Sequence, residues 1–183
     1  MSFGTKNVIL ITFFQLGSLA SSARPHCYNR GRAAGTLMAK RFTLAQAQDL
    51  LPTVDPLLRK AIEWKNRYAE ADRALQAFSQ RILFAGGVLI DRGEALAVKN
   101  KRAAAGQHLK ESIHEVQEHG CLIKDLDIGL LDFPTLFGGR EVYLCWKLGE
   151  SSISYWHGVD EGFAGRKEID RDFLEHHRGD RSQ

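Results

Sequence analysis

Residues 57–82 read LLRKAIEWKNRYAEADRALQAFSQRI, and their apolar positions predict a long helix that packs along another helix. These positions alternate in steps of four and three residues: Leu57, Ala61, Trp64, Tyr68, Ala71, Leu75, Phe78 and Ile82. The spacing places one apolar seam along a helix, as in a coiled coil, while charged residues occupy the other face. A seam of this length needs a partner helix to cover it.

The residues before this stretch indicate where helices begin. Thr43 and Gln46 have the spacing of a capping box, so a first helix should start at Leu44. Pro52 is expected to end that helix, because proline lacks the N–H that a helical hydrogen bond needs. Pro56, preceded by an aspartate, then predicts the start of the long helix.

The residues after the seam predict a return of the chain in a second helix. Gly86-Gly87 and the run Asp91-Arg92-Gly93 interrupt the helical pattern and indicate a turn or short loop. A second helix is expected over residues 94–119, with Gly120 as its C-terminal cap. The two long helices then form an antiparallel, coiled-coil-like hairpin.

The apolar period becomes strand-like after Gly120. Strands are expected over residues 121–124, 128–133, 140–148 and 153–156. Pro134 is expected to end the second strand, whereas the third has the clearest alternation of apolar and polar residues. The expected fold is α+β, with a small antiparallel β-meander packed on the helical hairpin.

Length and composition fit one globular domain. The chain has 183 residues, of which 44% are hydrophobic and 26% are charged. We expect a single α+β domain over residues 38–166. Residues 167–183 are rich in charge and poor in apolar residues, so they are expected to form a flexible, solvated tail with about one helical turn.

Residues 1–37 form a leader with a different composition. Lys6 precedes an apolar run of about nine residues, which is too short for a bilayer that takes about 20. Residues 1–23 therefore resemble a secretory signal peptide, and the lack of acidic residues also fits an organelle transit peptide. The interpretation we favour is an over-long gene start, with translation beginning at Met38. A genuine signal peptide would make the protein exported.

Charge and cysteine content limit the classes of partner and compartment. The net charge is +3, but four basic residues precede Met38, and removing them leaves −1 for residues 38–183. A nearly neutral domain is not expected to bind nucleic acid, and no stretch predicts a membrane span. The three cysteines form no Cys-x-x-Cys pair, which favours a cytoplasmic protein without disulfides.

Three successive motifs carry a family resemblance. They are residues 123–134 (IKDLDIGLLDFP), 139–150 (GREVYLCWKLGE) and 156–166 (WHGVDEGFAGR). Together with the opening residues 42–52, they resemble the domain of unknown function 2203 family over about residues 40–166. The resemblance implies no activity and no catalytic residues, and it leaves residues 1–37 outside the match.

The end of the last expected strand carries a candidate metal site. His157, Asp160 and Glu161 supply one nitrogen and two carboxylates, with Asp125 or Asp127 as a further ligand from the meander. Zinc or manganese accepts such a set. The alternative is that His157 forms a hydrogen bond with a neighbouring carboxylate, which is its more usual role.

The glycine-rich end of the last motif is a candidate anion site. Gly162 and Gly165 precede Arg166, so backbone N–H groups and a guanidinium can face the same anion. Arg140 is a second candidate cation, and Trp156 can form an aromatic wall beside the loop. The alternative is a plain chain reversal in which the glycines provide the turn.

Two further sets of residues are candidate catalytic groups. Cys145 is a candidate nucleophile with His157 as its base, but its place in a strand predicts a buried, inert thiol. Asp125, Asp127 and Asp132 are candidate general acids or bases, although carboxylates at turns more often cap them.

The incomplete catalytic set favours a non-enzymatic module that binds a ligand or a partner. The long seam also predicts a homodimer through the helical hairpin. The alternative is a metal-assisted hydrolase in which Arg140 or Arg166 holds an anionic small molecule.

Overall fold

The computed structural model describes residues 40–84 and 91–180. Its elements are, in chain order, α1 (Leu44–Phe84), α2 (Arg92–Glu118), β1 (Leu122–Asp125), β2 (Leu130–Phe137), β3 (Arg140–Lys147), β4 (Tyr155–Gly158), the 3₁₀ turn η1 (Phe163–Gly165), β5 (Lys167–Glu168), α3 (Arg171–His176) and β6 (His177–Arg178). The leader expected over residues 1–37 and the turn at Gly86-Gly87 lie outside the described residues, as do residues 181–183.

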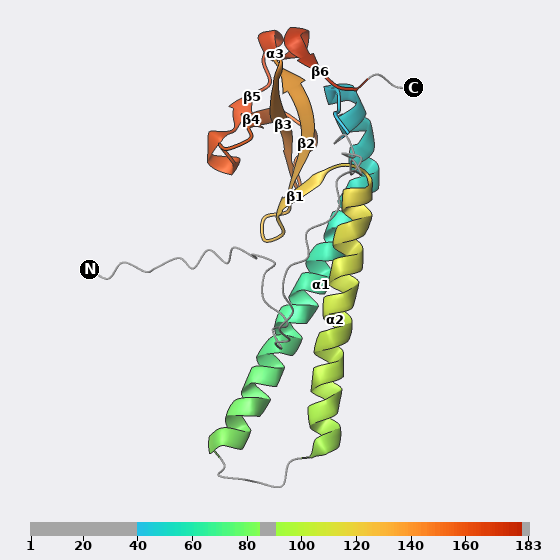
Figure 1. Ribbon diagram of the computed structural model, residues 1–183, viewed down its shortest axis with the longest axis vertical. Helices are drawn as coiled ribbons and strands as arrows, with labels where there is room; N and C mark the ends of the chain where they lie inside the picture. Colours follow the sequence, from blue (N-terminus) through green and yellow to red (C-terminus); the bar gives the residue numbers. More distant parts are fainter. Residues whose placement is uncertain (1–39, 85–90, 181–183) are drawn as a thin grey trace, which may run out of the picture. The chain divides into compact units, whose positions relative to one another are not determined.

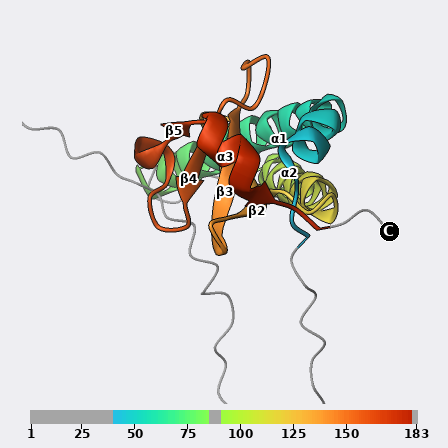
Figure 2. The ribbon, with the colours of Figure 1, turned by 90° about the horizontal axis from the view of Figure 1, so that it is seen from above.

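The α+β fold class is confirmed. Figures 1 and 2 show α1 and α2 side by side, and the sheet lies beside the end of this hairpin where α1 begins and α2 ends. All strand pairs are antiparallel, and the strand order is β1-β2-β3-β4-β5, with β6 also paired to β2. The core joins the first turns of α1 to one face of this sheet.

The expectation that Pro52 ends the first helix is wrong, because α1 continues through both Pro52 and Pro56. Each proline costs about 3 kcal/mol in a helix interior. Buried Val54 and Leu58 share the helix face that packs on the sheet, and each such side chain contributes about 1.5–3 kcal/mol on burial. Tertiary packing therefore outweighs the local break, and Figure 1 shows the cyan first turns tilted against the rest of α1.

The capping signals at both helix starts are realised. Thr43 Oγ1 accepts from the Gln46 N–H at 3.2 Å, and Gln46 Oε1 accepts from the Thr43 N–H at 2.8 Å, which confirms the capping box. Asp91 caps α2 by accepting from the N–H groups of Gly93 and Glu94. The second helix therefore begins at Arg92, so the loop expected at residues 91–93 is instead a cap and the first helical turn.

Pro134 does not end its strand, because β2 runs through it to Phe137. In an extended strand, the N–H and C=O of one residue point to the same side. The Pro134 carbonyl accepts from the Phe42 N–H at 2.7 Å, so its ring nitrogen also faces away from β3. On that edge of β2, β1 pairs with the residues before Pro134 and β6 with the residues after it. The N–H that proline lacks is therefore not needed for any hydrogen bond between β2 and β3.

The last hairpin strand is shifted relative to the expectation. Residues 153–156 were expected to pair with the third strand, but β4 spans Tyr155–Gly158 and includes His157. Ile153 is held outside the sheet, because its N–H donates to Gln48 Oε1 of α1 at 3.0 Å.

Residues 167–180 form ordered elements in place of the expected solvated tail. The side chain of Phe173 in α3 is fully buried, and β6 pairs with the end of β2. His177 Nε2 accepts from the Leu44 N–H at 3.0 Å, and the Asp180 N–H donates to the Arg41 carbonyl at 2.9 Å. Residues 177–180 thus pack against the start of α1.

Gly179 is a sensitive point of this packing. A Cβ atom at Gly179 would clash with the backbone of Phe42 and Thr43, so Gly179→Ala is expected to lower the free energy of unfolding by about 2 kcal/mol. Gly138→Ala is the control. A Cβ atom at Gly138 would meet no neighbour, so alanine there should cost only the strain of a left-handed backbone at φ 59°, about 1 kcal/mol. Urea denaturation of both variants tests the difference, and equal losses would contradict it.

Candidate functional site

The face of the sheet away from the core carries a buried polar group of side chains. Asp132 in β2 is the cross-strand partner of Cys145 in β3, and His157 in β4 is the partner of Tyr143, two residues before Cys145. Cross-strand partners and residues two apart share a face. Asp132, Cys145 and His157 are at most 1% exposed, and one ligand atom from each lies within 4.8 Å of the others. We call these three residues the polar cluster.

The polar cluster contains buried atoms that lack aligned hydrogen-bond partners. His157 Nδ1 lies 2.8 Å from the Gly158 carbonyl, and its Nε2 lies 3.1 Å from Asp132 Oδ2. The second contact is close but does not have hydrogen-bond geometry, so Nε2 and both Asp132 carboxylate oxygens remain unsatisfied. Lys124 Nζ stands 3.7 Å from Asp132 Oδ2, which is an ion-pair distance only. A buried carboxylate in this state costs several kcal/mol.

Cys145 has the properties of a protonated thiol. Burial, reinforced by the charge of Asp132, raises the pKa of Cys145 to about 12. The expectation of a buried thiol in the strand is confirmed. A thiol with this pKa is a poor nucleophile near neutral pH, because only the thiolate attacks.

The structure places other potential ligand residues beside His157 than those expected. Among the described residues, the polar cluster is the only group of three such side chains close enough to share an ion, and Asp160 and Glu161 are not part of it. Asp160 is exposed, and Glu161 accepts from the Gly158 N–H and from Lys167.

The two aspartates considered as further ligands are also engaged elsewhere. Asp125 Oδ1 accepts from the N–H groups of Asp127 and Ile128, as a turn cap does. Asp127 forms an ion pair with Lys65 of α1. Asp132 lies beside His157 because β2, β3 and β4 pair side by side. No local sequence pattern predicts the register of that pairing.

Arg166 already has an internal carboxylate partner. Its guanidinium binds both oxygens of Glu150, at 2.8 and 2.7 Å, and also donates to the Cys145 carbonyl at 3.3 Å. It lies over the ring of Tyr155 at 4.2 Å. Burial favours the protonated form of Glu150, but the hydrogen bonds from Arg166 and from the Lys147 N–H outweigh it and lower the pKa of Glu150.

The other residues of the expected anion site are not brought together around Arg166. The Gly165 N–H donates to the Gly162 carbonyl at 3.1 Å, so the loop satisfies this group internally. Arg140 begins β3, five residues before Cys145, which places it about 17 Å away along the strand. Trp156 packs on Phe137 and Phe173.

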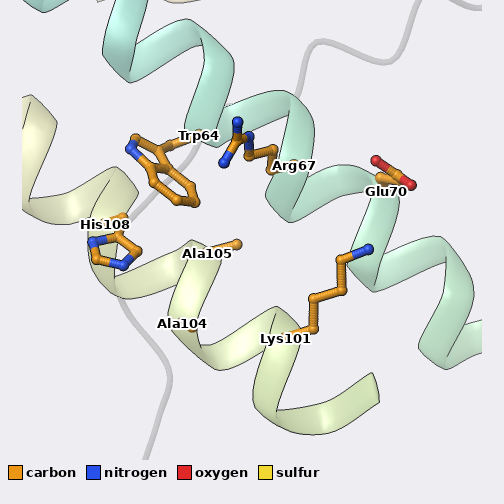
Figure 3. Close-up of a pocket in the computed structure, with 7 residues that line it drawn as sticks. All are labelled: Trp64, Arg67, Glu70, Lys101, Ala104, Ala105 and His108. Carbon is orange, nitrogen blue, oxygen red and sulfur yellow. The ribbon is translucent and has the colours of Figure 1, made fainter. Parts of the chain in front are cut away.

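A separate groove of about 400 Å³ lies between α1 and α2 (Figure 3). Ala104 and Ala105 line it beside Lys101, and Trp64 lies between His108 and Arg67. The centres of the Trp64 and His108 rings are 4.4 Å apart, and the Arg67 guanidinium lies 4.6 Å from the centre of the Trp64 ring. The chain's own side chains therefore already pack against the indole, and the groove contains no unsatisfied buried polar atom of the described residues.

A helical hairpin joined to an antiparallel sheet with a buried polar cluster defines a small α+β protein. Among its described helices, none has the length and hydropathy needed to cross a membrane. The family model described as an uncharacterized conserved protein, DUF2203, matches residues 40–169. The chain therefore belongs to the domain of unknown function 2203 family, as its motifs indicated. No curated protein and no solved structure matches it.

Proposed function

We propose that this protein is a non-enzymatic module that binds one zinc-class divalent cation through Asp132, Cys145 and His157. The observation that carries the proposal is the presence of three unsatisfied, buried ligand atoms, two carboxylate oxygens and one imidazole nitrogen, beside a buried sulfur. Oxygen, nitrogen and sulfur donors together suit zinc, which accepts all three. A cation bound in the polar cluster would satisfy these three atoms.

The distance between His157 and Asp132 fits two ligands of one tetrahedral ion. Two ligands bound at about 2.0–2.1 Å in a tetrahedral site lie about 3.3 Å apart. The contact between His157 Nε2 and Asp132 Oδ2 is 3.1 Å, which fits such an edge although it is not aligned as a hydrogen bond. His157 Nδ1 faces the Gly158 carbonyl, and this is the usual second contact of a metal-binding histidine.

The surroundings favour binding over hydrolysis. A hydrolase needs a metal ion that its substrate can reach, and the hydrolase considered from the sequence also needs Arg140 or Arg166 free to hold the anionic substrate. The three ligands are buried, Arg166 is bound to Glu150, and Arg140 lies about 17 Å along the strand from Cys145. The non-enzymatic module is therefore the better supported of the two functions.

A homodimer through the helical hairpin and a cytoplasmic location stay predictions. Exposed apolar side chains near the end of the hairpin support self-association, since Leu83, Phe84 and Leu96 are 79%, 89% and 58% exposed. Light scattering of the full chain tests the dimer, and a monomer at high concentration would contradict it.

The metal proposal is tested by metal analysis with a matched cysteine control. We expect the full chain, purified with zinc and without chelators, to retain one zinc ion, and Cys145→Ser to lose it. Cys121→Ser should retain zinc, because Cys121 is equally buried but is not part of the polar cluster. Cobalt titration should give a thiolate-to-cobalt charge-transfer band in the wild type and in Cys121→Ser only. A wild type that binds neither ion would refute the proposal.

A further inference from the structure

Lys124 is a partly exposed residue beside the polar cluster. It lies in β1, where the pairing with β2 shifts between Ile123 and Asp125. Such a bulge redirects the side chain of the extra residue, and bulges often lie beside functional sites. The Lys124 ammonium lies 3.7 Å from Asp132 Oδ2 and 4.3 Å from the centre of the Tyr143 ring.

Lys124 is freer to move than the members of the polar cluster. Its side chain is 37% exposed, whereas those of Asp132 and His157 are 0% and 1% exposed. Lysine carries its charge on a flexible four-carbon stem, so the ammonium can swing into water without moving the backbone. It makes no aligned hydrogen bond to Asp132, so the charge of Asp132 and the cation–π contact with the Tyr143 ring hold it there.

We propose that Lys124 is a tethered competitor of the metal ion, so that it controls the affinity of the site. This inference rests on the proposed metal-binding function. Without metal, the ammonium partly neutralises Asp132. A divalent cation bound to Asp132 would repel the ammonium strongly at a distance of about 4 Å. Metal binding therefore requires Lys124 to withdraw into solvent, and the work of displacing it lowers the affinity.

The test is the zinc affinity of charge variants, measured on the full chain by competition with a chelating indicator at fixed pH. Lys124→Gln removes the competing charge and is expected to bind zinc at least about tenfold more tightly than the wild type. Lys124→Arg keeps the charge and should stay within about threefold of the wild type. Lys65→Gln is a control, because Lys65 pairs with the exposed Asp127 and should leave the affinity unchanged.

A second measurement follows Lys124 itself. Its acylation by acetic anhydride, followed by peptide mass spectrometry, should speed up when zinc is added to the wild type. In Cys145→Ser the rate should not respond to zinc. Equal zinc affinity in the wild type and Lys124→Gln would overturn the competitor role while leaving the metal site intact. Absence of zinc binding in the wild type and in all variants would instead remove the metal site as well.

Discussion

Replacing Phe173 with alanine is expected to lower the free energy of unfolding by about 4 kcal/mol. The Phe173 side chain is fully buried, and its ring lies between 4.9 and 5.2 Å from the rings of Phe137, Trp156 and His177. Truncation would remove these contacts and leave a cavity that the β-sheet and α3 can close only in part. Urea denaturation followed by tryptophan fluorescence measures the loss, because Trp156 is one of the contacting rings.

Leu174→Ala is the matched control for this prediction. Leu174 is the next residue of the same short helix, but it is 49% exposed, so its truncation should cost less than about 1 kcal/mol. Similar losses in the two variants would mean that α3 does not pack as described. The outcome also bears on the extent of the domain, since Phe173 lies beyond residues 40–169, which the family model matches.

Phe173 also illustrates why the sequence predicted some elements and missed others. The capping box, the seam of α1 and the alternation in β3 are local signals, and each corresponds to an observed element. Residues 167–183 contain few apolar residues, so no local sequence pattern predicts that Phe173 packs into an aromatic cluster of the sheet. The effects of the two prolines were also not predictable from local sequence. Tertiary packing keeps Pro52 within α1, and Pro134 lies in the gap between β1 and β6 beside β2.

The polar cluster was only partly predictable for a related reason. His157 was recognised as a candidate ligand, but its partners were expected among its sequence neighbours Asp160 and Glu161. The observed partners Asp132 and Cys145 come from two other strands, and the pairing register that aligns them depends on the whole sheet. The strand position of Cys145 suggests a nucleophile at most, whereas its sulfur lies within 4.8 Å of ligand atoms of Asp132 and His157, and a metal ion bound there would deprotonate the thiol.

Arg166→Met is expected to lower the free energy of unfolding by about 3 kcal/mol at pH 7. The side chains of Arg166 and Glu150 are 11% and 26% exposed, so removal of the guanidinium would leave a largely buried carboxylate without its charge partner. The Arg166 guanidinium lies over the rings of Tyr155 and Phe163, and methionine retains an apolar stem that can still contact both. The loss therefore reports mainly the broken pair.

Lys167→Met provides the control from the adjacent position. Lys167 and its partner Glu161 are 48% and 42% exposed, and an exposed pair contributes at most about 1 kcal/mol. Chemical denaturation of both variants should therefore separate them clearly at neutral pH. If Lys167→Met lowered the free energy of unfolding as much as Arg166→Met does, the burial of the Arg166–Glu150 pair would not explain the loss in Arg166→Met.

The effect of Arg166→Met should also depend on pH in one direction. The folded pKa of Glu150 lies below its ordinary value of 4.5, so the pair contributes fully above pH 4.5. This contribution is lost as the pH falls below 4.5 and through the folded pKa, where Glu150 becomes protonated. The difference in stability between the wild type and Arg166→Met should therefore shrink on acidification. A difference that stays constant from pH 7 to about pH 3 would show that lost packing, and not the charge of Glu150, explains the variant.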